Sequence, residues 1–280
     1  MEKNHDVLEL KKKAISVRRD VLTMLEKAGS GHTGGSLSTI EILVELYYRI
    51  LNIDPSHPKK RERDKFVLSK GHGCPALYAV LADRGFFPKE ELKTLRTLKS
   101  RLQGHPQFGL PGLEISSGSL GQGLSISVGL ALADRMDGIK ARVYCLMGDG
   151  ETNEGQVWEA AMTAAHYKID TLCAIVDYNK LQIDGMCCEV KDMGEYREKW
   201  EHFGWHAIEA NGHDFDSLDR AFKETQSVVG KPQIVIAHTV KGKGVSFIEN
   251  KAEWHGIAPK KEELVRALAE LDAEEKMLTK

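Results

Sequence analysis

Apolar residues recur at helical spacing along several segments of the chain. In residues 6–28 they stand three or four apart, and the glycines at 29 and 31 end that pattern. Residues 36–51 continue it, with Ser38 as the expected N-cap and Glu41 three residues later. Further helices are expected at 75–86, 124–136, 153–168, 215–226 and 259–280, the last charged and amphipathic.

Shorter apolar runs alternate with these helices and end in glycine or polar residues. They are expected to form strands within 64–73, 142–150, 171–179, 204–210 and 231–240. Alternation of strand and helix predicts an α/β fold, a parallel sheet with helices on both faces. We expect one domain over residues 1–280, with an N-terminal helical arm, a C-terminal helix and an irregular Gly- and Pro-rich stretch at 101–123.

Composition narrows the class of protein. The 280 residues include 39 basic and 41 acidic ones, for a net charge of -2. That balance argues against a nucleic-acid binder, and the one dense basic stretch, residues 57–65, is interrupted by acids, as in a solvated loop.

Membrane association and secretion are not expected either. The first ten residues show no apolar signal region, and no run approaches 18 apolar residues. The five cysteines are odd in number, and two of them lie inside apolar runs. These features predict a reduced, cytoplasmic protein.

Two polar residues follow neighbouring expected strands. Asp149 lies between two glycines after one apolar run, and Asn179 follows the next run. Carboxyl ends of parallel strands meet at one edge of a sheet, where ligands bind. Mg²⁺ favours carboxylate and amide oxygens and often completes its octahedron with phosphates. The pattern predicts a site for magnesium and a diphosphate; the alternative is a tight Gly-Asp-Gly turn with Asn179 as a cap.

The Gly-Asp-Gly…Asn pattern resembles the thiamine diphosphate-binding motif, and the surrounding sequence resembles transketolase. The matching segments, in chain order, are GSGHTGG, LSKGHG, GHPQFGLPGLEISSGSLGQG, GDGETNEG, DYNKLQIDG and VKGKGVSFIENKAEWHG. Together they extend over nearly the whole chain. Enzymes of the pyruvate dehydrogenase type share the Gly-Asp-Gly motif but are not expected to show this ordered set of histidines.

The resemblance implies a role for each matching position. The metal, Mg²⁺ or in its place Ca²⁺ or Mn²⁺, would be held by Asp149, the Asn179 side chain and the Leu181 carbonyl. Thiamine diphosphate would be contacted by His72, Gly118, Ser119, Leu120, Gly150, Glu151, Glu154, Asn179, Ile183 and His255. The catalytic histidines would be His32, His72, His105 and His255, which can move protons near neutral pH. The other histidines considered, His57, His166, His202, His206 and His213, are expected to be structural, and His238 is left open.

The family's usual chain is more than twice as long, and this sequence resembles its first domain. In the family, the glutamate that activates the cofactor lies in the second domain, together with the residues that bind sugar phosphate. The resemblance therefore implies the N-terminal subunit of a split transketolase of the pentose phosphate pathway. Its partner would be a C-terminal subunit in an α2β2 heterotetramer, and its substrates sugar phosphates. Ser119 departs from the family, where many relatives carry proline.

Two other functions stay open. The chain could serve another split thiamine diphosphate enzyme, such as an apulose-phosphate transketolase or a relative of deoxyxylulose-phosphate synthase. It could also be a non-catalytic module that binds only the magnesium diphosphate. The ordered histidines favour a transketolase over the synthase, but they do not separate the sugar donors.

Overall fold

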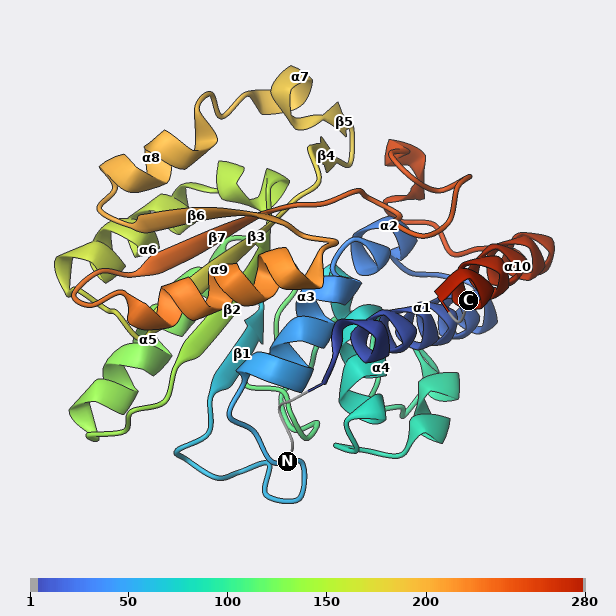
Figure 1. Ribbon diagram of the computed structural model, residues 1–280, viewed down its shortest axis with the longest axis horizontal. Coiled ribbons are helices and arrows are strands. Elements are labelled where there is room, and N and C mark those ends of the chain that lie inside the picture. The colour runs from blue at the N-terminus through green and yellow to red at the C-terminus, as the bar shows by residue number, and fades with distance from the viewer. Residues whose placement is uncertain (1–4, 279–280) are drawn as a thin grey trace.

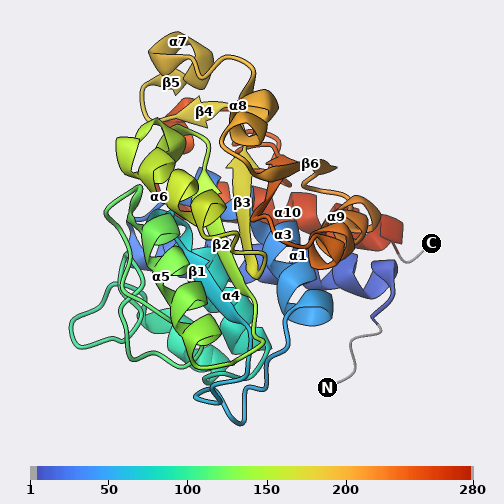
Figure 2. The ribbon, with the colours of Figure 1, turned by 90° about the vertical axis from the view of Figure 1, so that its left-hand side faces the viewer.

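A five-stranded parallel sheet forms the centre of the molecule (Figures 1 and 2). The computed structural model describes residues 5–278. The strands lie in the order β1 (Lys65–Leu68), β2 (Val143–Gly148), β3 (Leu172–Tyr178), β7 (Gln233–His238) and β6 (His206–Asn211). Every neighbouring pair is parallel, and Gly148 at the end of β2 pairs with Asp177 of β3. The parallel α/β sheet expected from the sequence is confirmed.

Helices cover both faces of this sheet. One face carries α5 (Gln122–Met136), α6 (Gly155–His166) and α8 (Tyr196–His202), and the other carries α1 (Val7–Ala28), α3 (Ile40–Glu45), α4 (Cys74–Asp83) and α9 (Phe215–Ser227). Strand side chains alternate between the two faces. Cys145 therefore packs with the helices of the first face, and its neighbour Tyr144 packs with those of the other. None of the helices within residues 5–278 is long and apolar enough to cross a membrane.

The first helix has the ends that its sequence predicts. The Asp6 carboxylate accepts a hydrogen bond from the Glu9 amide at 2.7 Å, and Gly29 ends the helix at φ 63°. The last helix, α10 (Lys261–Leu278), lies along α1 (Figure 1). Arg19 joins the two through ion pairs with Asp272 and Glu275.

The expected helix at 36–51 is corrected in two respects. Helical structure begins earlier, with α2 (Thr33–Leu37), and α3 is followed by a π-helical turn at Leu46–Ile50. The prediction that Ser38 caps a helix is wrong. Ser38 lies between two helical segments, and its hydroxyl donates to the Asp177 carboxylate at 2.7 Å, which leaves it no capping role.

The region after β3 contains elements that the sequence pattern did not indicate. These are the hairpin of β4 (Leu181–Gln182) and β5 (Gly185–Met186), then α7 (Cys187–Lys191) and α8. Short 3₁₀ turns also occur at Gly71–Gly73, Lys89–Thr94, Gly150–Asn153 and Ala252–Trp254. Elements of two to seven residues give too few repeats for a periodic pattern.

Candidate active site

A cavity of about 360 Å³ lies where the central strands end. It contains both residues of the Gly-Asp-Gly…Asn pattern, since Asp149 follows β2 and Asn179 follows β3. Its lining residues are Gly35, Lys70, His72, Leu120, Gly148, Asp149, Gly150, Glu151, Asn153, Glu154, Asn179, Leu181, Gln182, Ile183, Val190, Lys191, Lys241 and His255. The sheet thus brings together most of the positions proposed from the sequence.

Asp149 is a buried carboxylate held by backbone donors. Its Oδ1 accepts from the Gly150 amide at 2.8 Å, and its Oδ2 accepts from the Lys180 amide. Burial, with the nearby Asp177 carboxylate, raises the pKa of Asp149 to about 6. A carboxylate has several acceptor sites, so Asp149 can accept these hydrogen bonds and also serve as a metal ligand.

Asn179 is oriented at both ends of its amide. Its Nδ2 donates to the Asp177 carboxylate at 2.9 Å, and its Oδ1 accepts from the Leu181 amide at 3.1 Å. Among residues 5–278 no three His, Cys, Asp or Glu side chains form a metal-binding group by themselves. The Asp149 carboxylate, the Asn179 amide oxygen and the Leu181 carbonyl are hard oxygens, and such a donor set fits a hard cation that takes its other ligands from phosphate or water.

Four histidines from separate segments form one cluster. The ring centroid of His72 lies 5.2 Å from the ring centroid of His32 and 5.2 Å from that of His255. The centroids of His32 and His255 are 5.6 Å apart. His105 joins the cluster at 6.1 Å from His32. His72 and His255 line the cavity, so the cluster lies beside the Asp149 edge of the sheet.

The surroundings hold these imidazoles neutral. Burial, with Arg96 and His105 next in effect, lowers the pKa of His32 to about 4. Burial followed by Lys241 lowers the pKa of His255 to about 3. The pKa values of His72 and His105 are also lowered, first by burial. A neutral imidazole has one N–H donor and one acceptor nitrogen, so each ring can form a hydrogen bond in either sense with a bound substrate.

Two buried lysines also belong to the cavity, and the sequence analysis missed them. The Lys241 ammonium donates to the Leu181 carbonyl at 3.2 Å and lies 2.8 Å from His255 Nδ1. Burial and the nearby Lys70 lower the pKa of Lys241 to about 8. Lys70 follows β1 and Lys241 follows β7, so the strand-end rule places both near this edge of the sheet but gives no sign that they are buried.

The loop at 118–121 is tied to the Gly-Asp-Gly turn through Glu151. This buried carboxylate accepts from the Gly121 amide at 2.9 Å, from the Gly148 amide at 3.0 Å and from the Ser69 hydroxyl. Burial raises its pKa. Glu151 thus joins the loop at 118–121 to the end of β2, and its own contact with a cofactor stays a prediction.

The other proposed cofactor contacts lie at the rim. Leu120, Glu154 and the exposed Ile183 line the cavity, whereas Ser119 is exposed outside its lining. Gly118 lies at φ 151°, where a Cβ would stand 3.1 Å from the His105 ring. A larger residue at 118 would therefore disturb a histidine of the cluster.

The remaining histidines lie outside the cavity lining. His213 contacts Glu41 at 2.9 Å and accepts from the Val240 amide at 2.8 Å. Partners of the others are Asp54 for His57, Glu224 for His206, Glu209 for His238 and the Tyr167 ring for His166, and His202 lies in the last turn of α8.

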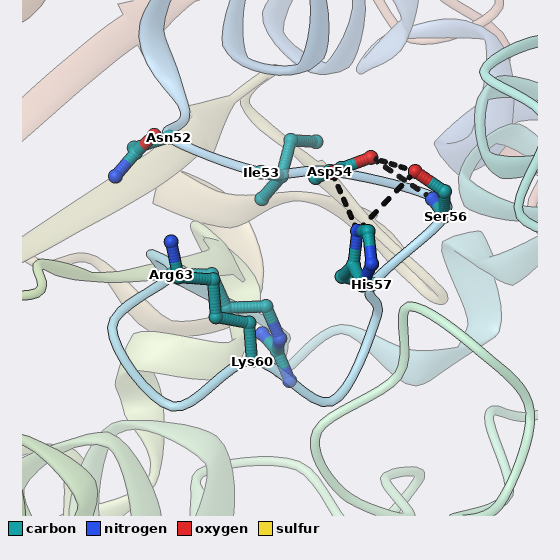
Figure 3. Close-up of a pocket in the computed structure, with 7 residues that line it drawn as sticks. All are labelled: Asn52, Ile53, Asp54, Ser56, His57, Lys60 and Arg63. Carbon is teal, nitrogen blue, oxygen red and sulfur yellow. Dashed lines mark hydrogen bonds and ion pairs between the residues drawn. The ribbon is translucent and has the colours of Figure 1, made fainter.

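A second hollow, of about 620 Å³, belongs to the loop before β1 (Figure 3). Several of its polar side chains have partners within the chain. Asp54 accepts from Ser56 and contacts His57, and Arg63 donates to the Pro58 carbonyl and the Glu114 carboxylate. The residues that line this hollow come before β1 in the chain, whereas the candidate site is formed by residues that follow the ends of the strands.

Comparison with known proteins shows the family to which the chain belongs. Residues 10–277 match the family model described as transketolase, thiamine diphosphate binding domain. The chain belongs to this family. Its members are transferases, and the family and fold expected from the sequence are confirmed.

Several relatives match over nearly their full length. The chain is 44% identical to the 6-deoxy-6-sulfo-D-fructose transketolase subunit of Clostridium sp. (strain MSTE9), covering 95% of this chain and 98% of that one. It is 43% identical to a subunit of the apulose-4-phosphate transketolase of Phocaeicola vulgatus, covering 91% and 90%.

Single-chain transketolases are longer. Human transketolase is 40% identical over 88% of this chain, which is 39% of its own length. The solved transketolase of Leishmania mexicana superposes with a TM-score of 0.88 at 28% identity, covering 96% of this chain and 46% of that one. This transketolase-family chain spans about half the length of the solved structures.

Proposed function

We propose that this chain is the N-terminal subunit of a split transketolase. With a C-terminal subunit it would transfer a two-carbon ketol unit from a ketose phosphate to an aldose phosphate. The observation that carries the proposal is the cluster of His32, His72, His105 and His255 beside the Asp149–Asn179 edge. Relatives that match over nearly their full length and are named as subunits support it.

Residues 1–280 would act as one diphosphate-binding domain. Asp149, Asn179 and the Leu181 carbonyl would hold Mg²⁺, or Ca²⁺ or Mn²⁺ in its place. The Lys241 ammonium and the N-terminal amides of α6 favour an anion on the same side. At Gly150 a Cβ would lie 3.0 Å from the Gln182 side chain, so glycine leaves room for a close ligand.

The histidines would handle protons around the substrate. Thiamine diphosphate supplies the carbanion chemistry when it is bound. The neutral imidazoles can accept the proton of a sugar hydroxyl, return it, and donate to an oxyanion that forms at the carbonyl. His255 is an exception, because its Nδ1 faces the Lys241 ammonium and its Nε2 carries the proton; it would donate to the oxyanion and not accept a proton.

The cofactor-activating glutamate is expected on the partner. Exposed apolar side chains on α5 and α6, Ile126, Met136 and Met162, favour docking in an α2β2 assembly that contains two copies of this chain. The five cysteines are free thiols, which fits a cytoplasmic protein.

A second candidate concerns the sugar. Relatives are named for 6-deoxy-6-sulfo-D-fructose and for apulose-4-phosphate, so one of these donors is the alternative to ordinary ketose phosphates. The test is to co-express the chain with the C-terminal half of a transketolase and to assay ketol transfer from all three donors. Turnover with any of them supports a split transketolase and identifies its donor. Cofactor binding without any turnover would instead favour a non-catalytic module.

A further inference from the structure

Asp177 is a buried carboxylate on which four segments meet. It lies in β3, two residues before Asn179, and none of its surface is exposed. Its Oδ2 accepts from the Lys70 ammonium at 2.5 Å, the Ser38 hydroxyl at 2.7 Å and the Asn179 amide at 2.9 Å. The Thr239 hydroxyl donates to its Oδ1. None of these contacts assigns Asp177 itself to metal, cofactor or substrate.

The contact with Asn179 fixes which end of that amide faces Asp177. An ionised carboxylate accepts hydrogen bonds and donates none. Asn179 must therefore turn its Nδ2 toward Asp177, which places its Oδ1 on the other side, where the Leu181 amide donates to it at 3.1 Å. A flipped amide would set its oxygen against the carboxylate and its N–H₂ group where an oxygen ligand is needed.

The charge of Asp177 is maintained inside the protein. The Lys70 ammonium lies 2.5 Å from the Asp177 carboxylate and compensates its negative charge, and two hydroxyls donate to the same group. Lys70 is itself buried and donates to the Gly35 carbonyl at 2.8 Å. The ion pair thus keeps an acceptor-only group beside the amide.

We propose that Asp177 is a positioning residue that locks the Asn179 amide with its oxygen toward the metal site. The inference rests on the proposed function, because Asn179 is a metal ligand only there. Removing the lock should weaken metal and cofactor binding about 10–100-fold, the usual effect of losing a partner that orients a metal ligand.

Two substitutions test this positioning role, one at Asp177 and one at Asn179. In Asp177→Asn, residue 177 can donate as well as accept, so it no longer selects one amide orientation. In Asn179→Asp, the ligand becomes a carboxylate, which Mg²⁺ ordinarily favours. The donor to Asp177 is lost, however, and two carboxylates face each other. The proposal expects weaker binding in both variants.

Ser38→Ala is the matched control. It removes a different donor from the same Asp177 oxygen and leaves the contact with Asn179 in place. The measurement is binding of Mn²⁺ with thiamine diphosphate to the purified chain, followed by water-proton relaxation, alongside the melting temperature of each variant. We expect at least tenfold weaker binding in Asp177→Asn and Asn179→Asp, and a near-unchanged constant in Ser38→Ala.

Other results would overturn the inference. Unchanged binding in Asp177→Asn, wild-type or tighter binding in Asn179→Asp, or an equal loss in Ser38→Ala would each reduce Asp177 to a structural role. If Asp177→Asn does not fold, Asn179→Asp decides alone. If the wild-type chain binds no Mn²⁺ with the cofactor, the proposed metal site is refuted, and the inference with it. If the wild type binds but the variants bind as the inference does not allow, only the inference is refuted.

Discussion

Asp149 supplies the one carboxylate among the three proposed metal ligands. Replacing it with alanine removes the charged ligand and leaves the backbone amides of Gly150 and Lys180 without an acceptor. We expect Asp149→Ala to abolish metal-dependent cofactor binding in the reconstituted enzyme while the chain still folds. Isothermal titration with thiamine diphosphate and Mg²⁺ checks this, and unchanged affinity would refute the metal assignment.

We expect His32 and His105 to act on substrate more than on cofactor. Both belong to the histidine cluster, and neither lines the cavity around Asp149. His32→Ala and His105→Ala should therefore lower turnover by about 10²–10⁴ while cofactor affinity changes little. Steady-state rates and cofactor titration separate the two effects. A variant that keeps near-normal turnover would show that its histidine is structural.

The lowered histidine pKa values also predict a pH dependence of stability. His32 has a pKa of about 4 in the folded chain against 6.5 when unperturbed. Between those values the unfolded chain binds a proton that the folded chain does not, so stability falls as pH falls from 6.5 toward 4. Glu45, with its pKa raised to about 7 by burial, acts in the opposite direction.

Comparing the wild type with His32→Asn isolates one histidine. From pH 7.5 to 5.5 the wild type should lose about 1 kcal/mol more than the variant after allowance for partial exposure of the ring. That is about 2 °C in melting temperature for a chain of this length. Equal losses of stability in the two proteins would contradict a His32 that stays neutral in the folded chain.

For single residues, the sequence predicted the polar side chains that directly follow an apolar strand. Asp149 and Asn179 follow apolar runs, so their position alone indicated a site. Lys70 and Lys241 also follow strands, but lysine is nearly always solvated, and only the three-dimensional packing shows that both are buried. The link from Asp177 to Ser38 joins distant segments and has no local signal.

The first turn of helix α5 lies so close to Ser69, just after β1, that only glycine fits at position 123. At Gly123 a Cβ would lie 2.3 Å from the Ser69 side chain and 2.7 Å from its Cα. Gly123→Ala should push α5 away and cost about 1–3 kcal/mol of unfolding free energy. Urea denaturation measures it.

Gly129, on the same helix, is the control. Apart from the neighbouring backbone of α5 itself, no described atom lies within 4 Å of the position that a Cβ would take there. Gly129→Ala should stabilise the chain by about 0.5–1 kcal/mol, because alanine favours helix more than glycine does. Equal effects of the two substitutions would mean that the α5–Ser69 contact is not tight.

Long amphipathic elements were predicted well and short ones were not. The 22 residues of α1 repeat the helical pattern several times and carry clear caps. The segment from Thr33 to Ile50 is buried on nearly all sides, so its breaks leave no polar stripe to mark them. The β4–β5 hairpin has two residues per strand and is set by the loop it closes.

For the whole molecule, alternation of strand and helix was enough to predict the parallel sheet. Strand order was not, since β7 lies between β3 and β6 only because of long-range pairing. The need for a partner came from the family resemblance, and relatives named as subunits agree with it.

The most direct test of the account is ketol transfer by the purified chain with and without a C-terminal transketolase subunit. Both samples receive saturating thiamine diphosphate, Mg²⁺ and sugar phosphates. The metal and diphosphate half of the site is proposed on this chain and the cofactor-activating glutamate on the partner, so the chain alone should give no turnover and the mixture should be active. Turnover by the chain alone at the rate of a full-length transketolase would contradict the split site and require an activating glutamate within these 280 residues.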